Sequence, residues 1–339
     1  MEVLQFKQLL KQANSLNLTK VSNTKGVLTL MLEMILSIGV VFGLLVTKAW
    51  SLPFFILEIL AGIVIFRWFV ILHECGHKTL YSSLIANTFV GHIASIFCLI
   101  PYFPWRNVHL LHHRWVGIID KDPTQKDLLK LHHSSNVQNM LFRIVWRLWI
   151  PIPFAQFLYK VFWGYAFVAL KNKEYKNFRL GLFSNLICLI AHGLIIGFLS
   201  LSTWATYFLP MLVVFYFMIE NMNLPQHSEL FPYLSDTRAE PIPFAQQDEI
   251  TRSTHLPDLL GCILALNFNR HTEHHLFPAT PWYNLNKMRK MLIDSGYSVP
   301  NEVEFMEFMY KLRSRDPLHI YRDSLPKPVA SVVNLNNQV

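Results

Sequence analysis

The chain has few charged residues and few cysteines, and both shortages limit the kinds of protein it can be. Asp, Glu, Lys and Arg make up 15% of its 339 residues, against about 25% in ordinary globular domains. The four cysteines include no C-x-x-C pair, which argues against a disulfide scaffold and a cysteine-ligated zinc module. With 52% hydrophobic residues and a mean hydropathy of +0.29, the composition predicts a membrane protein.

Acidic residues are scarcer than basic ones, 22 against 30, and the net charge is +8. Basic chains often bind nucleic acid, but here the basic residues lie between and beyond apolar stretches. An anionic lipid surface explains that placement better. We therefore expect membrane lipids as partners and no nucleic acid.

Four apolar runs are long enough to cross a membrane as helices. They cover residues 27–46, 54–72, 180–201 and 203–219, with short linkers within the first and the second pair. We predict an all-α integral membrane protein with four transmembrane helices arranged as two hairpins. Lys and Arg are sparse at the hairpin tips, so the positive-inside rule puts both termini and the long middle loop in the cytoplasm. The N-terminal segment lacks the features of a cleaved signal peptide, so we expect the first span to be retained.

Histidine is the residue type that indicates chemistry in this sequence. One H-x-x-x-H motif and two H-x-x-H-H motifs occur. Residues three and four positions apart share one face of a helix, so each motif can direct at least two imidazoles at one point. Without a metal, so many buried imidazoles would each need hydrogen-bond partners. The motifs contribute the candidate metal ligands His73, His77, His109, His112, His113, His271, His274 and His275.

Two further apolar stretches, 84–105 and 147–170, lie between the predicted spans. Histidine motifs flank the first stretch, and a single crossing there would put them on opposite faces of the membrane. We expect both stretches to be interfacial or re-entrant segments, although a fifth and a sixth span remain an alternative. The motifs would then belong to a cytoplasmic helical cap together with the C-terminal third, where a helix is predicted to begin at Asn301.

Ligands that are all imidazoles suit iron, copper or zinc. Structural zinc uses four ligands and usually includes cysteine, whereas this set is large enough for two metals of higher coordination number. Isolated histidines inside apolar runs, such as His92 and His192, are expected to be ordinary buried residues. Acidic side chains close to the motifs could orient the imidazoles from behind. The candidates for that role are Glu74, Asp120, Asp122 and Glu273.

The motifs and their surroundings resemble the membrane fatty-acid desaturases and hydroxylases. That family has one H-x-x-x-H and two H-x-x-H-H motifs in this order, and the resemblance covers roughly residues 70–285. It implies two non-haem iron ions that use dioxygen and two electrons, with an acyl chain or another lipid as substrate. The most similar stretches are His73-Glu-Cys-Gly-His77, Pro101-Tyr-Phe-Pro-Trp-Arg-Asn-Val-His109 and Asn267-Phe-Asn-Arg-His271-Thr-Glu-His274-His275.

The resemblance also implies ligand positions outside the motifs. Relatives have a further ligand histidine just after the last span, and some have an asparagine four residues earlier that approaches the metal through water. His227 and Asn223 stand at these positions. Pro225 lies between them and should push Leu224 out of the helical region, so the pair is not expected to share a clean helical face.

These features favour a fatty-acyl desaturase that introduces a double bond into an acyl lipid. A lipid hydroxylase, or a carotenoid ketolase or hydroxylase, would use similar motifs. A histidine-rich membrane metal transporter is an alternative of another class, but it would need polar residues in mid-membrane. The chain has no haem-binding H-P-G-G motif, so the resemblance implies a separate electron donor, either a ferredoxin or a b-type cytochrome with its reductase.

We divide the chain into a cytoplasmic N-terminal segment (1–26), a membrane domain (27–323) and a flexible tail (324–339). The active site and both termini are expected on the cytoplasmic side of the membrane. A bacterial inner membrane is favoured over the endoplasmic reticulum.

Overall fold

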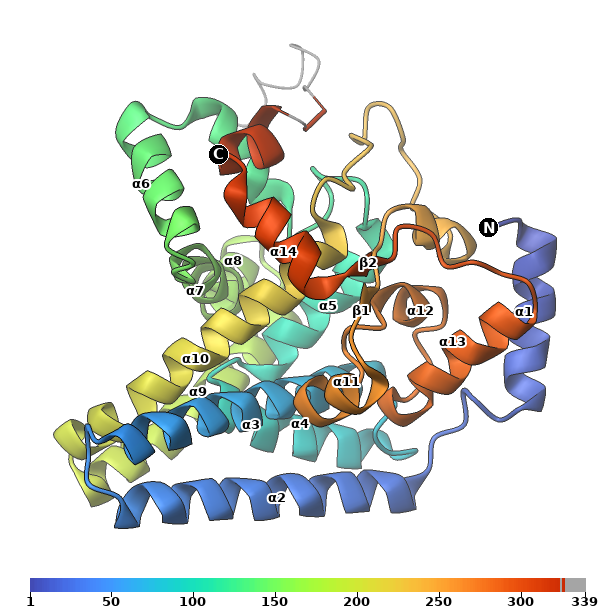
Figure 1. Cartoon of the computed structure of the whole chain (residues 1–339). Coiled ribbons are helices and arrows are strands. Elements are labelled where there is room, and N and C mark those ends of the chain that lie inside the picture. Colours follow the sequence, from blue (N-terminus) through green and yellow to red (C-terminus); the bar gives the residue numbers. More distant parts are fainter. Residues whose placement is uncertain (324, 327–339) are drawn as a thin grey trace.

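The computed structural model describes residues 1–323 and 325–326, and its regular structure is mostly helical (Figure 1). Four helices are long and apolar enough to span a membrane: α2 (Asn23–Val46), α3 (Leu52–His77), α9 (Tyr175–Leu199) and α10 (Leu201–His227). They coincide with the four predicted spans, which confirms the predicted all-α, multi-pass membrane fold. The predicted tail, 324–339, lies outside the described residues except for 325 and 326.

Short turns join the helices within each hairpin. The hydroxyl of Ser51 accepts a hydrogen bond from the Phe54 N–H at 3.4 Å at the start of α3, and Ser200 accepts one from the Thr203 N–H at 3.2 Å at the start of α10. Such N-caps satisfy N–H groups that have no partner within the helix. In Figure 1 the two turns lie together at the lower left, and most of the shorter helices gather toward the opposite end of the bundle.

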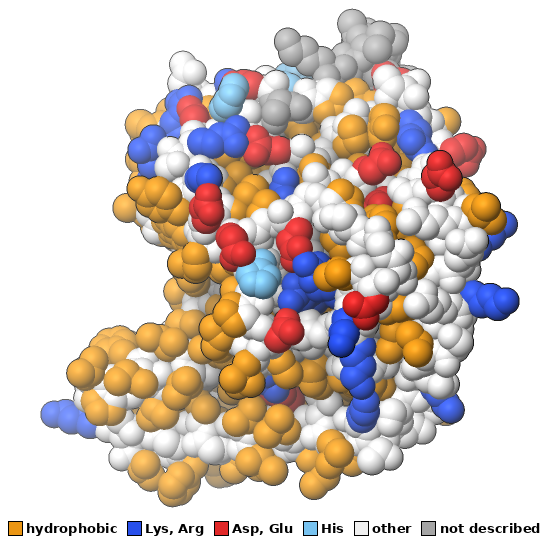
Figure 2. Space-filling model, turned by 45° about the vertical axis from the view of Figure 1, so that its right-hand side comes forward, with side chains coloured by type: hydrophobic (Ala, Val, Ile, Leu, Met, Phe, Trp, Pro, Cys, Tyr) orange, Lys and Arg blue, Asp and Glu red, His pale blue; other side chains and the backbone are white. Residues whose placement is uncertain are grey.

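Helix α3 is the most buried span and packs against α2, α4 and α10. Gly62 permits the close approach of α10, because a Cβ at this position would lie 2.4 Å from Val214 Cγ1. Figure 2 shows hydrophobic side chains covering the projecting lobe at its lower left. Exposed apolar side chains are expected on surfaces that face lipid. Those on the spans include Ile38, Phe42, Leu194 and Phe198.

The two stretches predicted to lie at the membrane surface belong to bent helix pairs. The first forms α4 (Leu84–Cys98) and α5 (Tyr102–Trp115), which meet at 101°. This bend returns α5 to the end of α3, so the first two histidine motifs lie at the same end of the bundle. The second pair bends by 109° after α6. Its region contains α6 (Asn136–Arg147), α7 (Ile152–Leu158), the π-helical η2 (Tyr159–Trp163) and α8 (Tyr165–Lys171).

The C-terminal third forms a cap over the end of the bundle that carries the histidines (Figure 1). The cap contains α11 (Asp258–Ala265), α12 (His271–Leu276), α13 (Leu285–Asp294), α14 (Phe305–Ser314) and a parallel pairing of β1 (Thr254–His255) with β2 (Val303–Glu304). The other short elements are α1 (Val3–Ser15), η1 (Lys126–His133), η3 (Phe244–Glu249), η4 (Trp282–Asn284) and η5 (His319–Asp323). The prediction of a helix start at Asn301 is wrong, because Val303 and Glu304 pair with β1 and α14 begins only at Phe305.

A buried ion pair connects the spans to the cap. Arg67 of α3 donates to both carboxylate oxygens of Glu33 of α2, with a distance of 2.9 Å from Nε to Oε2. The same guanidinium donates to the backbone carbonyls of Cys262 and Ile263 in the last turn of α11. Carbonyls at a helix end lack partners within the helix. Arg67 therefore holds the end of α11, shortly before the third histidine motif.

Candidate metal centre and the adjoining cavity

Nine histidines from α3, α5, α10 and α12 converge where the bundle meets the cap. They form two groups, and within each group one ring nitrogen per residue lies within 4.8 Å of the others. The first group consists of His73, His77, His109, His113 and His274, and the second of His112, His227, His271 and His275. These are all the histidines that the sequence indicates as ligands, so the structure brings the whole set together.

Helical geometry decides which histidine joins which group. In each H-x-x-H-H motif, the two histidines four positions apart stay together: His109 and His113 in the first group, His271 and His275 in the second. The histidine between them is rotated about 100° around the helix from its neighbour and joins the other group. Each of these motifs is therefore shared between both groups.

In the first group, Nε2 atoms meet at hydrogen-bond distance. His109 Nε2 lies 2.8 Å from His77 Nε2 and 3.1 Å from His113 Nε2, and the latter lies 3.0 Å from His274 Nε2. A neutral imidazole has one N–H and one lone pair, so these protons cannot satisfy every contact in the converging set. Both ring nitrogens of His73 are buried without a hydrogen-bond partner among the described residues. A cation that accepts one lone pair from each imidazole would satisfy the converging Nε2 atoms and one ring nitrogen of His73.

The second group also has ring nitrogens at close distance and a buried ring nitrogen without a partner. His271 Nε2 lies 2.8 Å from His227 Nε2, and His275 Nε2 is buried with no partner in the part of the chain that the structure describes. The ring centroid of His112 is 4.7 Å from that of His227 and 5.3 Å from that of His275. Both donor sets, five and four imidazoles, suit a first-row transition metal.

The carboxylate of Asp122 orients His112 from behind. Asp122 Oδ2 lies 2.8 Å from His112 Nδ1, and Oδ1 accepts hydrogen bonds from the backbone N–H and the hydroxyl of Thr124 at 2.9 and 2.8 Å. An acceptor at Nδ1 keeps the imidazole proton there and leaves the Nε2 lone pair for a metal. Asp122 therefore has the orienting role that the sequence predicts for it.

Two further acceptors come from η3 and the residue after it, and sequence reasoning missed both. Gln247 Oε1 lies 2.8 Å from His275 Nδ1, and the backbone carbonyl of Ile250 lies 3.4 Å from His227 Nδ1. The Gln247 side chain is fixed because its Nε2 donates to the carbonyl of His113 at 2.9 Å. No motif or spacing in the sequence connects this loop with the histidines.

The other predicted orienting acids have different partners. Glu74 Oε1 lies 3.5 Å from His73 Nδ1 without a hydrogen bond between them. Asp120 instead accepts the backbone N–H of Ser235 at 2.9 Å, and Glu273 pairs with an arginine of α13 at 2.9 Å. The expectation that Asp120 and Glu273 orient imidazoles is wrong, because their carboxylates point toward the surrounding loops and α13.

Burial lowers the pKa of the three α12 histidines well below the ordinary histidine value of 6.5, and neighbouring imidazoles lower it further. Burial disfavours the charged form because it removes water from around the ring. His271, His274 and His275 are therefore neutral at pH 7. Neutral imidazole is the form that binds a metal ion.

The isolated histidines lie apart from both groups. His192 is a satisfied buried residue, with Nε2 2.9 Å from the carbonyl of Ile96 and Nδ1 accepting from Trp204 Nε1 at 3.1 Å. His92 packs among aromatic rings, with Tyr102 and Phe103 at centroid distances of 5.2 Å. His192 matches the prediction of an ordinary, satisfied buried residue, whereas both ring nitrogens of His92 are buried without a hydrogen-bond partner among the described residues.

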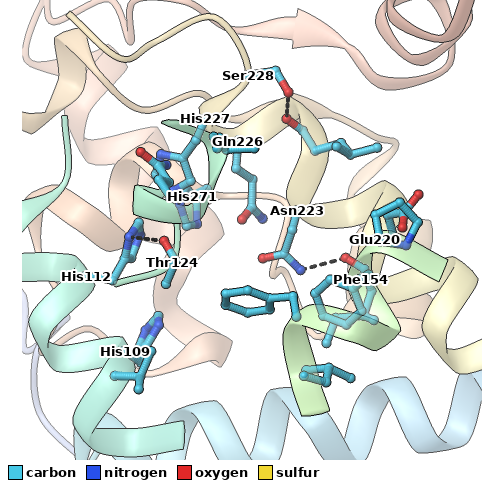
Figure 3. A pocket seen from close by; sticks show the side chains of 18 of the residues that line it. His109, His112, Thr124, Phe154, Glu220, Asn223, Gln226, His227, Ser228 and His271 are labelled. Carbon is cyan, nitrogen blue, oxygen red and sulfur yellow. Dashed lines mark hydrogen bonds between the residues drawn. The ribbon is translucent and has the colours of Figure 1, made fainter. Parts of the chain in front are cut away.

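A cavity of about 300 Å³ lies against both histidine groups (Figure 3). His73 and His109 of the first group line it, together with His112, His227 and His271 of the second. Most of its remaining wall is aromatic or aliphatic and comes from α3, α5, α6, α7, η2 and α10. These side chains include Phe69, Trp105, Phe142, Phe154, Phe157 and Phe162, and Phe268 from the turn between α11 and α12 adds to them. An apolar chain in this cavity would lie beside both groups.

Asn223 lines the cavity from α10, one helical turn before His227. Its Nδ2 donates to the carbonyl of Ile219 at 2.6 Å. In Figure 3 its side-chain oxygen points to the side of the cavity where His112 and His271 lie. The amide of Asn223 therefore faces the second group across the cavity.

Helix α10 continues through Pro225 to His227, contrary to the expectation that proline would disturb this turn. The carbonyl of Pro225 accepts a hydrogen bond from Arg252 at 2.7 Å, and that of Leu224 accepts one from the hydroxyl of Ser228. These side-chain donors replace partners that the helix end lacks. They stabilise the helical turn that carries His227.

Comparison with known proteins agrees with this geometry. Residues 20–299 match the sequence profile of the family described as fatty acid desaturase. The omega-3 fatty acid desaturase fat-1 of Caenorhabditis elegans is 27% identical over 300 residues, 80% of this chain and 70% of the relative. An sn-1 oleoyl-lipid 12-desaturase of Picosynechococcus sp. is 25% identical over 272 residues, 75% and 74% of the two chains. An endoplasmic-reticulum omega-3 fatty acid desaturase of Vigna radiata is 25% identical over 284 residues, which are 78% of this chain and 72% of the relative. The chain is therefore a multi-pass membrane enzyme of the fatty acid desaturase family.

Proposed function

We propose that this protein is an acyl-lipid desaturase that holds two iron ions and introduces a double bond into a fatty-acyl chain. The observation that carries the proposal is the position of the apolar cavity, which runs along both histidine groups. The relatives named above are two omega-3 fatty acid desaturases and an sn-1 oleoyl-lipid 12-desaturase, which supports desaturation over hydroxylation.

The first iron would be held by the five-histidine group and the second by the four-histidine group. The fit rests on convergent Nε2 atoms and on buried ring nitrogens of His73 and His275 that have no partner among the described residues. Neutral imidazoles without cysteine suit iron. When bound, iron would activate dioxygen as the oxidant, and the protein contributes binding, orientation and exclusion of water.

The overall reaction removes one hydrogen from each of two neighbouring carbons of the chain. These two hydrogens, two electrons from a donor and two protons reduce dioxygen to two molecules of water. The cavity walls hold the chain by apolar contact and keep bulk water away. Asn223, fixed by its bond to the carbonyl of Ile219, presents an oxygen that can hold a water molecule near the second iron.

We further propose that the protein lies in a bacterial inner membrane, with the active site and both termini on the cytoplasmic side. Helix α1 and η5 lie at the histidine end of the bundle (Figure 1), and basic residues are concentrated outside the hairpin turns, which supports this orientation. The two electrons would come from a separate ferredoxin or b-type cytochrome that reaches this side of the membrane.

The test is expression in a host with a simple lipid profile, followed by mass spectrometry of its acyl chains. We expect a new species two mass units lighter than its precursor, and purified protein with two iron equivalents. A product heavier by one oxygen would replace desaturation by hydroxylation. Full activity with one zinc ion and no iron would contradict the metal assignment.

Single substitutions test the ligand set. Replacing His73, His112 or His274 by alanine should abolish turnover while the protein remains in the membrane. His227→Ala should lose iron as severely as these variants, whereas Asn223→Ala should have a milder effect because its contact is through water. Normal iron content and turnover in His227→Ala would restrict the site to the three motifs.

A further inference from the structure

Helix α6 carries apolar side chains on two faces, an inner face that lines the cavity and an outer face that is exposed. Its inner face carries Phe142 and Trp146, which line the cavity beside the histidines. Trp146 is held to the cap, because its Nε1 donates to the carbonyl of Arg315 at 3.1 Å and the Arg313 guanidinium lies 4.3 Å from its ring centroid. This face therefore belongs to the folded interior.

The outer face of α6 is also apolar. Its side chains recur at the spacing of one helical face, and 46–63% of each is exposed. No other part of the described chain covers them. They are Val137, Met140, Leu141, Ile144 and, directly after the helix, Leu148. Contiguous exposed apolar surface of this kind indicates contact with a membrane or a partner.

This face is continuous with the lipid-facing surface of the spans. After α6, Trp149 stacks on Phe217 of α10 with a centroid distance of 6.2 Å, and Phe217 is itself 38% exposed. Further along, Tyr159 and Phe167 are 73% and 75% exposed. The exposed apolar surface thus runs from α6 past the span α10 to α8, which packs on the span α9.

Charge at the edge of this surface favours lipid over a protein partner. Arg147 ends α6 and Lys160 lies in η2, and both are exposed. Basic side chains flanking an apolar helix face are typical of helices in the membrane interface, where they contact phosphate groups.

We propose that the outer face of α6 is immersed in the bilayer and that the acyl chain reaches the cavity sideways from the membrane, past α6 and α7. The wall between lipid and cavity is only one helix thick here, since Leu141 faces outward and its neighbour Phe142 faces the cavity. Sideways access suits the acyl-lipid substrate of the proposed function, and it does not suit an acyl chain carried by a water-soluble thioester. This substrate assignment rests on the proposed desaturase function.

The position of α6 can be measured without enzymatic activity. A fluorescent label on Leu141→Cys, in protein whose partly exposed Cys262 is replaced by serine, should be quenched in bilayers of brominated phosphatidylglycerol. A label on Phe42→Cys of α2 is the matched lipid-facing control, and a label on Ala239→Cys, in an exposed polar loop, is the water-facing control. We expect the Leu141 label to behave like the Phe42 label. A Leu141 label no more quenched than the Ala239 label would overturn the proposal.

The substrate assignment is tested with two oleoyl donors, dioleoyl phosphatidylglycerol in the bilayer and oleoyl-coenzyme A in water. The wild-type enzyme should act on the phospholipid, and Leu141→Asp should raise its KM about tenfold or more, because a charge is costly in hydrocarbon. Ala239→Asp should leave KM unchanged. Preferred turnover of the soluble thioester, or an unchanged KM in Leu141→Asp, would refute sideways access. Turnover of neither donor would contradict the desaturase function itself, while the quenching result would still decide where α6 lies.

Discussion

Asp122→Asn tests whether a residue that touches no metal controls metal binding at the second histidine group. The Asp122 carboxylate is fully buried and uses both oxygens: Oδ1 accepts two hydrogen bonds from Thr124, and Oδ2 faces His112 Nδ1 at 2.8 Å. Asparagine has nearly the same shape but only one acceptor oxygen. If that oxygen stays with the two donors of Thr124, the amide NH₂ faces His112.

The substitution should therefore reverse the proton arrangement of the imidazole. An NH₂ group opposite Nδ1 favours a lone pair on Nδ1 and a proton on Nε2, and a protonated Nε2 cannot bind a metal. Loss of such an orienting contact costs about 10–100-fold in metal affinity, which corresponds to about 1.4–2.8 kcal/mol. We expect this loss of affinity mainly for one of the two metal ions, the one bound by the second histidine group.

Anaerobic titration of the metal-free protein with Fe(II), followed by calorimetry, gives the two dissociation constants directly. The control is Asp120→Asn, the same substitution two residues earlier, where the carboxylate binds the backbone N–H of Ser235 and no imidazole. Asp120→Asn should keep wild-type affinity. Equal losses in the two variants, or wild-type affinity in Asp122→Asn, would refute the reasoning.

Three other predictions concern stability and topology. Glu33→Gln leaves Arg67 buried without its charge partner, which should cost about 3–5 kcal/mol, and a thermal midpoint equal to that of the wild type would contradict this. Metal-free protein should lose stability as pH falls below 6.5, because the three α12 histidines have a lowered pKa in the folded state. Below that pH the unfolded chain binds more protons than the folded chain. Denaturant titrations at pH 7.5 and 5.5 measure the difference in the free energy of unfolding, and equal values would argue against the prediction. Cysteines at Ser82 and Asn107 should be labelled from the same side of the membrane, since α4 and α5 bend back by 101°, and labelling from opposite sides would require α4 to cross.

The spans could be predicted because they depend on composition alone. Each predicted apolar run lies within or close to one observed helix, and two of the helices extend beyond the predicted end where ligands follow. Helix α3 continues from the predicted end at Leu72 to His77, and α10 continues from Ile219 to His227. Hydropathy cannot detect these extensions, because the added turns carry polar side chains that line the metal centre.

The histidine set could also be predicted, but its division could not. Spacing indicates that His109 and His113 share a helix face, yet it does not indicate which neighbouring helix each side chain meets. That depends on the packing of α3, α5, α10 and α12. The role of Gln247 could not be predicted either, since it lies 28 residues before its partner His275 in the short helix η3, which no motif connects with the histidines.

The division of each H-x-x-H-H motif has a mechanical consequence. His112 and His113 are neighbours in the chain, with Cα atoms about 3.8 Å apart, but they belong to different histidine groups. His274 and His275 do the same on α12. The spacing of the two histidine groups is therefore constrained by adjacent residues on two helices. Each group also combines histidines of the bundle helices with histidines of α12, so a movement of the cap relative to the bundle would disturb both groups at once.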